Sequence, residues 1–186
     1  MTTFYLVRHA HAKWTLDENR SLSARGLEDA KQVADVLQNY PIRAIYSSPE
    51  RRAFQTISPL SEQLDIQIEI ETDLRERKLG DEMFEDFLGA VEATWQDPSF
   101  AHPGGESSIE AQRRGLNVMK ELQVEYPNDA VVLSTHGNLM ALILQAFDPS
   151  IDFVFWKSLT MPDIYQLTIK QAGSGSIKRL WTSAAK

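Results

Sequence analysis

Short apolar runs and stretches of helical period alternate along the chain. Residues 4–7, 42–46 and 130–133 are mostly apolar runs of strand length. Such runs are typical of strands buried on both faces of a sheet. Between the first two runs, apolar side chains recur at helical spacing, at Leu27, Ala30, Val33, Ala34 and Leu37. The pattern predicts βαβ units, and therefore an α/β sandwich with a mostly parallel central sheet and helices on both faces.

Capping and turn residues give the expected boundaries. Ser23 is predicted to cap the first helix, and Ser48 to cap the second, with Pro49 at its first helical position. Pro59 should bend that second helix. Further predicted elements are a half-buried strand at 66–70, a helix at 106–125, an apolar helix at 139–147, and an antiparallel hairpin of 164–170 with 176–181 around Gly173-Ser174-Gly175.

Two features of this pattern concern organisation. The helix at 106–125 should turn Ile109, Leu116, Met119 and Leu122 inward. No repeat or linker divides the chain, so we expect one domain over residues 1–186, with an irregular flap at about 81–103.

Composition narrows the class of protein. The 186 residues are 42% hydrophobic and 24% charged, which is typical of a globular chain. The absence of cysteine excludes disulfides, thiolate metal sites and thiol nucleophiles. A net charge of −7 argues against a general nucleic-acid binder, although a few arginines can still make one pocket positive.

Targeting signals are also missing from the sequence. The longest uninterrupted apolar run, 139–144, is far below the ~20 residues of a membrane helix. The N-terminus has no basic region followed by an apolar stretch. We therefore expect a cytoplasmic protein without a membrane partner.

Polar groups follow the predicted strands directly. Arg8-His9 follows the first strand, residues 47–52 follow the second, Arg75-Glu76 comes soon after the third, and His136-Gly137 follows the fourth. Ligands of open α/β sheets bind outside the carboxyl ends of the strands, so these groups should meet in one crevice. We also expect the helix after His136 to direct its first backbone N–H groups at a bound anion.

These residue types favour phosphoryl chemistry. A neutral imidazole is a competent nucleophile near pH 7. The planar guanidinium of arginine matches phosphate oxygens and stabilises the negative charge of phosphoryl transfer. A nearby carboxylic acid can protonate the leaving oxygen.

Five blocks in chain order resemble the histidine phosphatase (phosphoglycerate mutase-like) superfamily. Leu6-Val7-Arg8-His9-Ala10 is similar to its Arg-His-Gly signature. Ser48-Pro49-Glu50-Arg51-Arg52-Ala53-Phe54-Gln55-Thr56 is similar to its second block, with Arg52, Ala53, Gln55 and Thr56 in register. The other three are Leu74-Arg75-Glu76 with Gly80, Gly104-Gly105-Glu106-Ser107, and Ser134-Thr135-His136-Gly137. Leu22-Ser23 with Gly26 also fits, so the resemblance covers most of the chain and implies a phosphoglycerate mutase-like fold.

The resemblance implies a role for each matching residue. His9 would attack phosphorus and become a phosphohistidine, while Arg8, Arg52 and His136 hold the phosphoryl oxygens. Glu76 would protonate the leaving group and then take a proton from the attacking water. Gly137 and His11 are further candidates for phosphate or substrate contact. The implied ligands are a small phosphorylated substrate and phosphate as product, with no metal or organic cofactor.

Departures from the family pattern fall around the expected pocket. Ala10 stands where glycine is common, and His11-Ala12 replaces an acidic or amide residue followed by threonine. Gly80-Asp81-Glu82-Met83 lacks the frequent tryptophan, and it leaves Asp81, Glu82 and Glu85 as other candidate acids. Glu106 is either a pocket residue or a carboxylate that favours its helix N-terminus. His102, Trp95 and Phe100 are expected to belong to the flap.

The short tail after Trp181 favours a small phosphatase that hydrolyses its phosphohistidine. Three alternatives remain open. They are a phosphoglycerate mutase, a phosphatase of phosphohistidine in a partner protein, and a binding module that holds phosphate without turnover.

Overall fold

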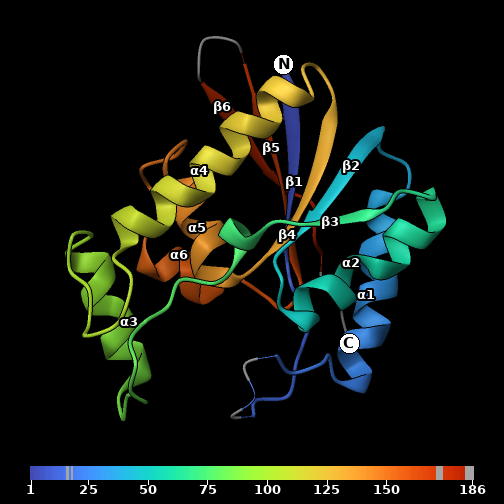
Figure 1. Ribbon diagram of the computed structural model, residues 1–186. Helices are drawn as coiled ribbons and strands as arrows, with labels where there is room; N and C mark the ends of the chain where they lie inside the picture. Colours follow the sequence, from blue (N-terminus) through green and yellow to red (C-terminus); the bar gives the residue numbers. More distant parts are fainter. Residues whose placement is uncertain (16, 18, 171–173, 183–186) are drawn as a thin grey trace.

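A computed structural model describes residues 1–15, 17, 19–170 and 174–182 of the chain. Its centre is a six-stranded sheet in the order β3-β2-β4-β1-β5-β6 (Figure 1). The first four strands in that order are parallel, whereas β5 and β6 pair antiparallel. The predicted α/β class, mostly parallel with an antiparallel C-terminal hairpin, is confirmed.

The described elements follow the predicted order. The strands are β1 (Thr2–Arg8), β2 (Ile42–Ser47), β3 (Ile68–Ile70), β4 (Ala130–Thr135), β5 (Asp163–Ile169) and β6 (Gly175–Arg179). The helices are α1 (Ala24–Leu37), α2 (Arg51–Leu64), the 3-10 turn η1 (Thr72–Leu74), α3 (Phe87–Gln96), α4 (Ser108–Glu125), α5 (Gly137–Gln145) and α6 (Phe153–Ser158).

Alternating side chains of β1 build two cores, one on each face of the sheet. Phe4 and Leu6 pack in the cluster that includes the buried side chains of α4 and α5. Tyr5 and Val7 pack in the cluster that includes α1 and α2. Figure 1 shows α1 and α2 on one side of the sheet and α4, α5 and α6 on the other. In the described part of the chain, no helix is long and apolar enough to cross a membrane.

Helix starts differ in how well the sequence predicts them. Ser23 caps α1 as expected, because its hydroxyl accepts a hydrogen bond from the Gly26 amide. The prediction that Ser48 caps α2 is wrong: the N-cap is Glu50, and Pro49 lies outside the helix. The Ser48 hydroxyl is instead engaged in the site described below.

The inward face of α4 also needs a correction. Ile109 is 49% exposed, whereas Met119 and Leu122 are buried as predicted. The buried face of α4 instead includes Ser108 and Ala111, on either side of Ile109 in the sequence. Leu116 is partly buried against the core.

Strand register brings the ends of three parallel strands together. Arg8 at the end of β1 lies opposite Thr135 of β4. Ser134, also on β4, lies opposite Ser47 at the end of β2. The segments at 9–15 and 75–87 both extend beyond this carboxyl edge of the sheet (Figure 1). The polar groups that follow the strands therefore share one edge.

Two other predictions, the C-terminal hairpin and the flap, are tested only in part by the described residues. In the hairpin, Ile169 pairs with Gly175, but the predicted turn residue Gly173 lies outside the described residues. The expected flap at about 81–103 contains α3, and its action as a lid stays a prediction.

Candidate active site

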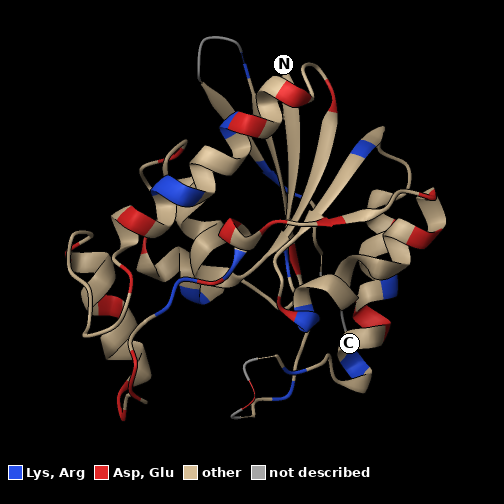
Figure 2. Cartoon of the chain, viewed as in Figure 1, with Lys and Arg blue, Asp and Glu red and all other residues tan. Residues whose placement is uncertain are grey.

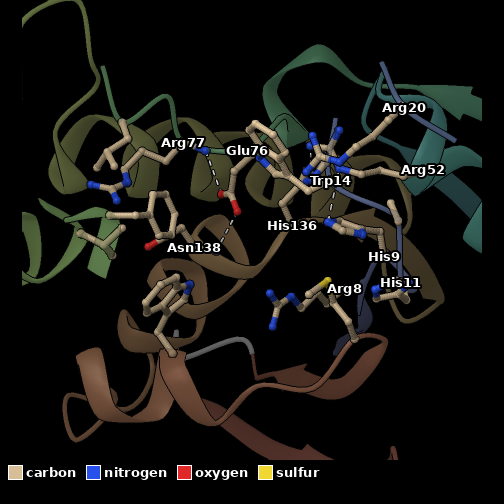
Figure 3. Close-up of a pocket in the computed structure, with 16 residues that line it drawn as sticks. Arg8, His9, His11, Trp14, Arg20, Arg52, Glu76, Arg77, His136 and Asn138 are labelled. Carbon is tan, nitrogen blue, oxygen red and sulfur yellow. Dashed lines mark hydrogen bonds between the residues drawn. The ribbon is translucent and has the colours of Figure 1, made fainter. Parts of the chain in front are cut away.

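A cavity of about 450 Å³ opens at the carboxyl edge of the sheet. Its lining includes Arg8, His9, His11, Arg52, Glu76 and His136, which come from four separate parts of the chain. Figure 3 shows the guanidiniums of Arg8 and Arg52 and the His9 ring around the same space, with Glu76 across from them. We refer to this cavity as the catalytic cleft.

Arg52, in the first turn of α2, links the two histidines. Its Nε donates to His9 Nε2 at 3.3 Å, and one terminal nitrogen donates to His136 Nδ1 at 3.1 Å. The two imidazole rings lie edge to face, with centroids 5.1 Å apart. One guanidinium and two ring nitrogens therefore converge on one position, an arrangement that suits the oxygens of a phosphoryl group.

The protonation state of His9 follows from its surroundings. Burial, together with the charges of His136, Arg52 and Arg8, lowers the pKa of His9 well below its ordinary value, against the opposing effect of the Ala10 carbonyl. The ring is therefore neutral at pH 7. Its Nδ1 lies 2.8 Å from the Ala10 carbonyl oxygen, which can only accept, so Nδ1 carries the hydrogen. The lone pair is then on Nε2, which faces Arg52.

His136 is held from its other nitrogen by two residues of the loop before α2. Its Nε2 lies 2.8 Å from the Ser48 hydroxyl and 3.0 Å from a Glu50 carboxylate oxygen. Burial raises the pKa of Glu50, but hydrogen bonding to His136 and Ser48 outweighs burial and lowers the pKa to about 2. Glu50 therefore presents a carboxylate to His136. Because Ser48 and Glu50 both bind His136, neither of their side chains caps α2.

Arg8 approaches the cleft from the end of β1. One terminal nitrogen donates to the Leu159 carbonyl at 2.8 Å, while the buried Nε has no partner among the described residues. Burial lowers the pKa of Arg8, and the charges of Glu76 and Asp163 oppose that shift. Gly137 allows this position, since a Cβ there would lie 2.9 Å from Arg8 Nε.

Glu76 is oriented by the N-terminus of α5. Its carboxylate accepts hydrogen bonds from the backbone amides of Asn138 and Leu139, each at 3.0 Å, and from Arg77 at 2.8 Å. The expectation that these helix amides face the anion is therefore wrong for Asn138 and Leu139. They hold the candidate acid instead, and fix its direction across the cleft from His9 (Figure 3).

Of the other candidates, Arg75, Glu106 and His102 lie outside the catalytic cleft, whereas His11 lies in its lining. Arg75 pairs with Asp73 at 2.6 Å, and Glu106 pairs with Arg114 at 2.7 Å, so Glu106 stabilises the start of α4. His102 Nε2 donates to the Ala90 carbonyl at 2.9 Å, which ties the flap to α3. His11 lines the cleft, and its Nδ1 lies 2.8 Å from the Ser23 hydroxyl.

Several lining residues were not predicted from the sequence. Arg77 and Asn138 directly follow Glu76 and Gly137, so adjacency to the motifs was the available signal. Trp14, Arg20, Trp156 and Met161 carry no motif signal, because only the fold brings their segments to the cleft. Together with Arg8, Arg52 and Arg77, Arg20 makes four arginines in the lining.

The donor set does not favour a metal ion. Among the described residues, no group of three or more His, Cys, Asp or Glu is placed to hold one. Arginines surround the two histidines, and guanidiniums repel a cation. The prediction of a metal-free site stays a prediction.

Several known proteins are similar to this chain in sequence and in fold. The family model of the histidine phosphatase superfamily (branch 1) matches residues 4–181. The chain is 27% identical over 150 residues to PhoE, an uncharacterised phosphatase of Bacillus subtilis (strain 168), covering 77% of this chain and 76% of PhoE. It is 32% identical over 140 residues to the glucosyl-3-phosphoglycerate phosphatase of Mycobacterium tuberculosis (strain ATCC 25618 / H37Rv), covering 67% and 63% of the two chains.

A solved structure extends the similarity to nearly the whole fold. The mycobacterial glucosyl-3-phosphoglycerate phosphatase in complex with inorganic phosphate superimposes with a TM-score of 0.79 at 26% identity, covering 98% of this chain and 97% of that one. With the family model matching almost the full length, this chain belongs to the histidine phosphatase superfamily.

Proposed function

We propose that this protein is a phosphomonoesterase that hydrolyses a small phosphorylated substrate through a phosphohistidine on His9. The observation that carries the proposal is the convergence of Arg52 on His9 Nε2 and His136 Nδ1 in the cleft that also contains Arg8 and Glu76. Family membership and the phosphatase names of the relatives support the same reaction class.

In the first step, the lone pair of His9 Nε2 attacks phosphorus, and the bond from phosphorus to the ester oxygen breaks. Arg8 and Arg52 stabilise the charge that develops on the phosphoryl oxygens, and His136 joins them when Arg52 turns to the phosphate and Nδ1 takes up a proton to donate. Protonated Glu76 gives its proton to the leaving oxygen, so the alcohol departs neutral.

In the second step, water attacks the phosphohistidine and the bond from phosphorus to nitrogen breaks. Glu76, now a carboxylate, takes a proton from the water. Phosphate leaves and His9 regains its lone pair. Because every step uses side chains of this chain, we propose that the reaction requires no metal or organic cofactor.

Trapping the intermediate tests the proposal. Reactions with phosphorus-labelled phenyl phosphate, quenched in alkaline detergent, should leave label on the protein that is stable in base, labile in acid and maps to His9. His9→Ala should remove the label and at least about 10³-fold of kcat. Circular dichroism should match the wild type, because the exchange removes a ring that lines a cavity. Undiminished turnover by a folded His9→Ala protein would remove His9 as the nucleophile.

A further inference from the structure

Large apolar side chains lie exposed beside the catalytic cleft. Trp14 is 66% exposed, Phe87 53% and Met83 75%. Single exposed apolar residues are ordinary, but a group around one cavity indicates a surface that binds something apolar.

These side chains line a second cavity of about 400 Å³, which we call the side chamber. Trp14, Leu79 and Phe87 line both the side chamber and the catalytic cleft, so the two spaces adjoin each other. The rest of its wall is Gly80, Met83, Phe84 and one charged residue, Glu82. The side chamber is therefore an apolar extension of the cleft.

The side chamber lies on the side where the leaving group must go. Glu76 would protonate the leaving oxygen, so the alcohol must extend from phosphorus toward Glu76. Leu79 and Phe87 follow Glu76 along the same segment and line the space beyond it. An alcohol that departs past Glu76 therefore meets apolar walls.

Packing gives the wall a defined shape. The Phe84 ring lies 4.6 Å from the His102 ring, between centroids, and His102 is itself bound to the Ala90 carbonyl of α3. Gly80 permits this position, because a Cβ there would come within 2.8 Å of the Phe84 ring.

Charge around the side chamber disfavours a second anionic group. Asp81, Glu82, Glu85 and Asp86 are all exposed in the segment that forms its outer wall. Figure 2 shows this segment as a run of red at the tip of the chain before α3. Lys78 pairs with Asp81, but within residues 78–86 four carboxylates face this one cationic side chain. A carboxylate or second phosphate on the alcohol would be repelled there.

We propose that the side chamber binds the alcohol portion of the substrate, and that the substrate is the phosphate monoester of an uncharged apolar alcohol, such as one that carries an aromatic ring. The inference rests on the proposed phosphatase function and names the substrate class of the same site. The apolar walls, the three lining residues shared with the cleft and the acidic rim all favour this occupant over a small or acidic one.

Matched substrates test the inference without changing the chemistry of the leaving oxygen. Propyl phosphate and 3-phenylpropyl phosphate differ by a terminal phenyl group. We expect kcat/KM to be about tenfold or more higher for the phenyl compound, because burial of an aromatic ring gives at least that factor. 3-Carboxypropyl phosphate should fall below propyl phosphate, because the acidic rim repels its carboxylate.

Variants locate the effect in the side chamber. Trp14→Ala and Phe87→Ala should bring the ratio between the phenyl and propyl compounds toward one, and Trp14→Phe should keep most of it. Val124→Ala is the control, because Val124, near the C-terminus of α4, is 79% exposed and lines neither cavity. This variant should leave the ratio unchanged.

The outcomes separate the inference from the phosphatase function. Equal kcat/KM for the phenyl and propyl compounds, or a preference for the carboxylate, would overturn the inference and leave the phosphatase in place. No hydrolysis of any of the three, with no phosphate on His9, would overturn the phosphatase and the inference with it. A dimer in light scattering that Trp14→Ala dissociates would assign these side chains to an interface between two copies, which also overturns the inference.

Discussion

Glu50 lies within the second block of the resemblance, which implied no role for it, yet its side chain orients His136. Its carboxylate lies 3.0 Å from His136 Nε2, while Arg52 donates to Nδ1 of the same ring. The two contacts fix both the tilt of the ring and the location of its hydrogen, which is on Nε2 because arginine can only donate. A carboxylate that orients a histidine in this way keeps the opposite nitrogen directed into the cleft.

Replacing Glu50 should give a pH-dependent loss of stability. The pKa of Glu50 is lowered to about 2 in the folded protein, whereas an unperturbed glutamate titrates near 4.5. The stabilisation from Glu50 is therefore fully present above about pH 4.5 and disappears as the pH falls toward 2. Glu50→Gln should lower the free energy of unfolding by roughly 1–3 kcal/mol at pH 7 and by less than about half of that at pH 3.

Urea unfolding at the two pH values measures this difference. Glu62→Gln is the matched control, since Glu62 is an exposed glutamate on the same helix, α2. It should change the free energy of unfolding by less than about 0.5 kcal/mol at either pH. A loss of equal size for Glu50→Gln at pH 7 and pH 3 would show that the carboxylate charge is not the stabilising feature.

At the scale of elements, α5 serves two parts of the site at once. His136 is its N-cap, and the next amides hold Glu76. Its first residue, Gly137, packs directly against the guanidinium of Arg8. One helix start therefore sets the distance between the phosphate-binding arginine, the second histidine and the candidate acid.

Gly137→Ala should separate activity from stability. The new Cβ would lie 2.9 Å from Arg8 Nε and 3.2 Å from a terminal nitrogen, so the end of the Arg8 side chain must move. A displacement of about 1 Å can reduce the rate about 10²-fold, so we expect kcat/KM to fall by about 10- to 100-fold. The free energy of unfolding should change by less than about 1 kcal/mol, because a flexible side chain absorbs the clash.

Gly115→Ala is the matched comparison, which should reduce stability instead of activity. A Cβ at Gly115 of α4 would lie 2.8 Å from Ile143 Cδ1 in the core between α4 and α5. Overpacking there should lower the free energy of unfolding by about 1–3 kcal/mol. If Gly137→Ala lost stability as Gly115→Ala does, with kcat/KM unchanged, the contact with Arg8 would have no catalytic consequence.

The sequence predicts those elements whose stabilisation is local or periodic. The apolar run at 4–7 and the Ser23 cap lie within β1 and at the start of α1, because burial pattern and capping are encoded in neighbouring residues. Ser48 was predicted as a cap because serine commonly caps helices, but a long-range contact with His136 takes its hydroxyl. The same holds for the amides of α5, whose partner Glu76 is about sixty residues earlier in the chain.

Site residues follow the same division. Arg8, His9, Arg52, Glu76 and His136 were predicted, because each follows a strand within a recognisable block, and the fold gathers them. Trp14 and Met161 were not, because their segments have no periodic signal and reach the cleft only through the packing of distant elements. Glu106 is a candidate pocket residue by sequence, but its ion pair with Arg114 holds its side chain against α4.

For the whole molecule, the charge of the cleft opposes the charge of the surface. The chain has a formal net charge of −7, which repels a phosphorylated substrate at long range. The cleft nevertheless has four arginines and one glutamate in its lining. Because fields are screened within about 10 Å at ordinary ionic strength, the local guanidiniums decide binding once the substrate reaches the cleft mouth.

Inorganic phosphate should therefore stabilise the folded protein. A ligand that binds only the folded state at about 100 times its Kd adds about 2.7 kcal/mol to the free energy of unfolding. For a chain of this length that corresponds to a rise in Tm of about 5–10 °C. Differential scanning fluorimetry should record a saturable rise with phosphate, and a much smaller one with chloride at equal ionic strength.

The same measurement distinguishes the cleft from a metal-dependent site. Arg52→Ala should lose most of the rise in Tm, since Arg52 is the group that joins both histidines. A chelator such as EDTA should leave both the rise and the hydrolysis rate unchanged, because guanidiniums surround the imidazoles and the Glu76 oxygens already accept three backbone amides. Loss of both on chelation, with recovery on adding a divalent cation, would mean that the positive charge at the phosphoryl group comes from a metal and that the arginines alone do not suffice.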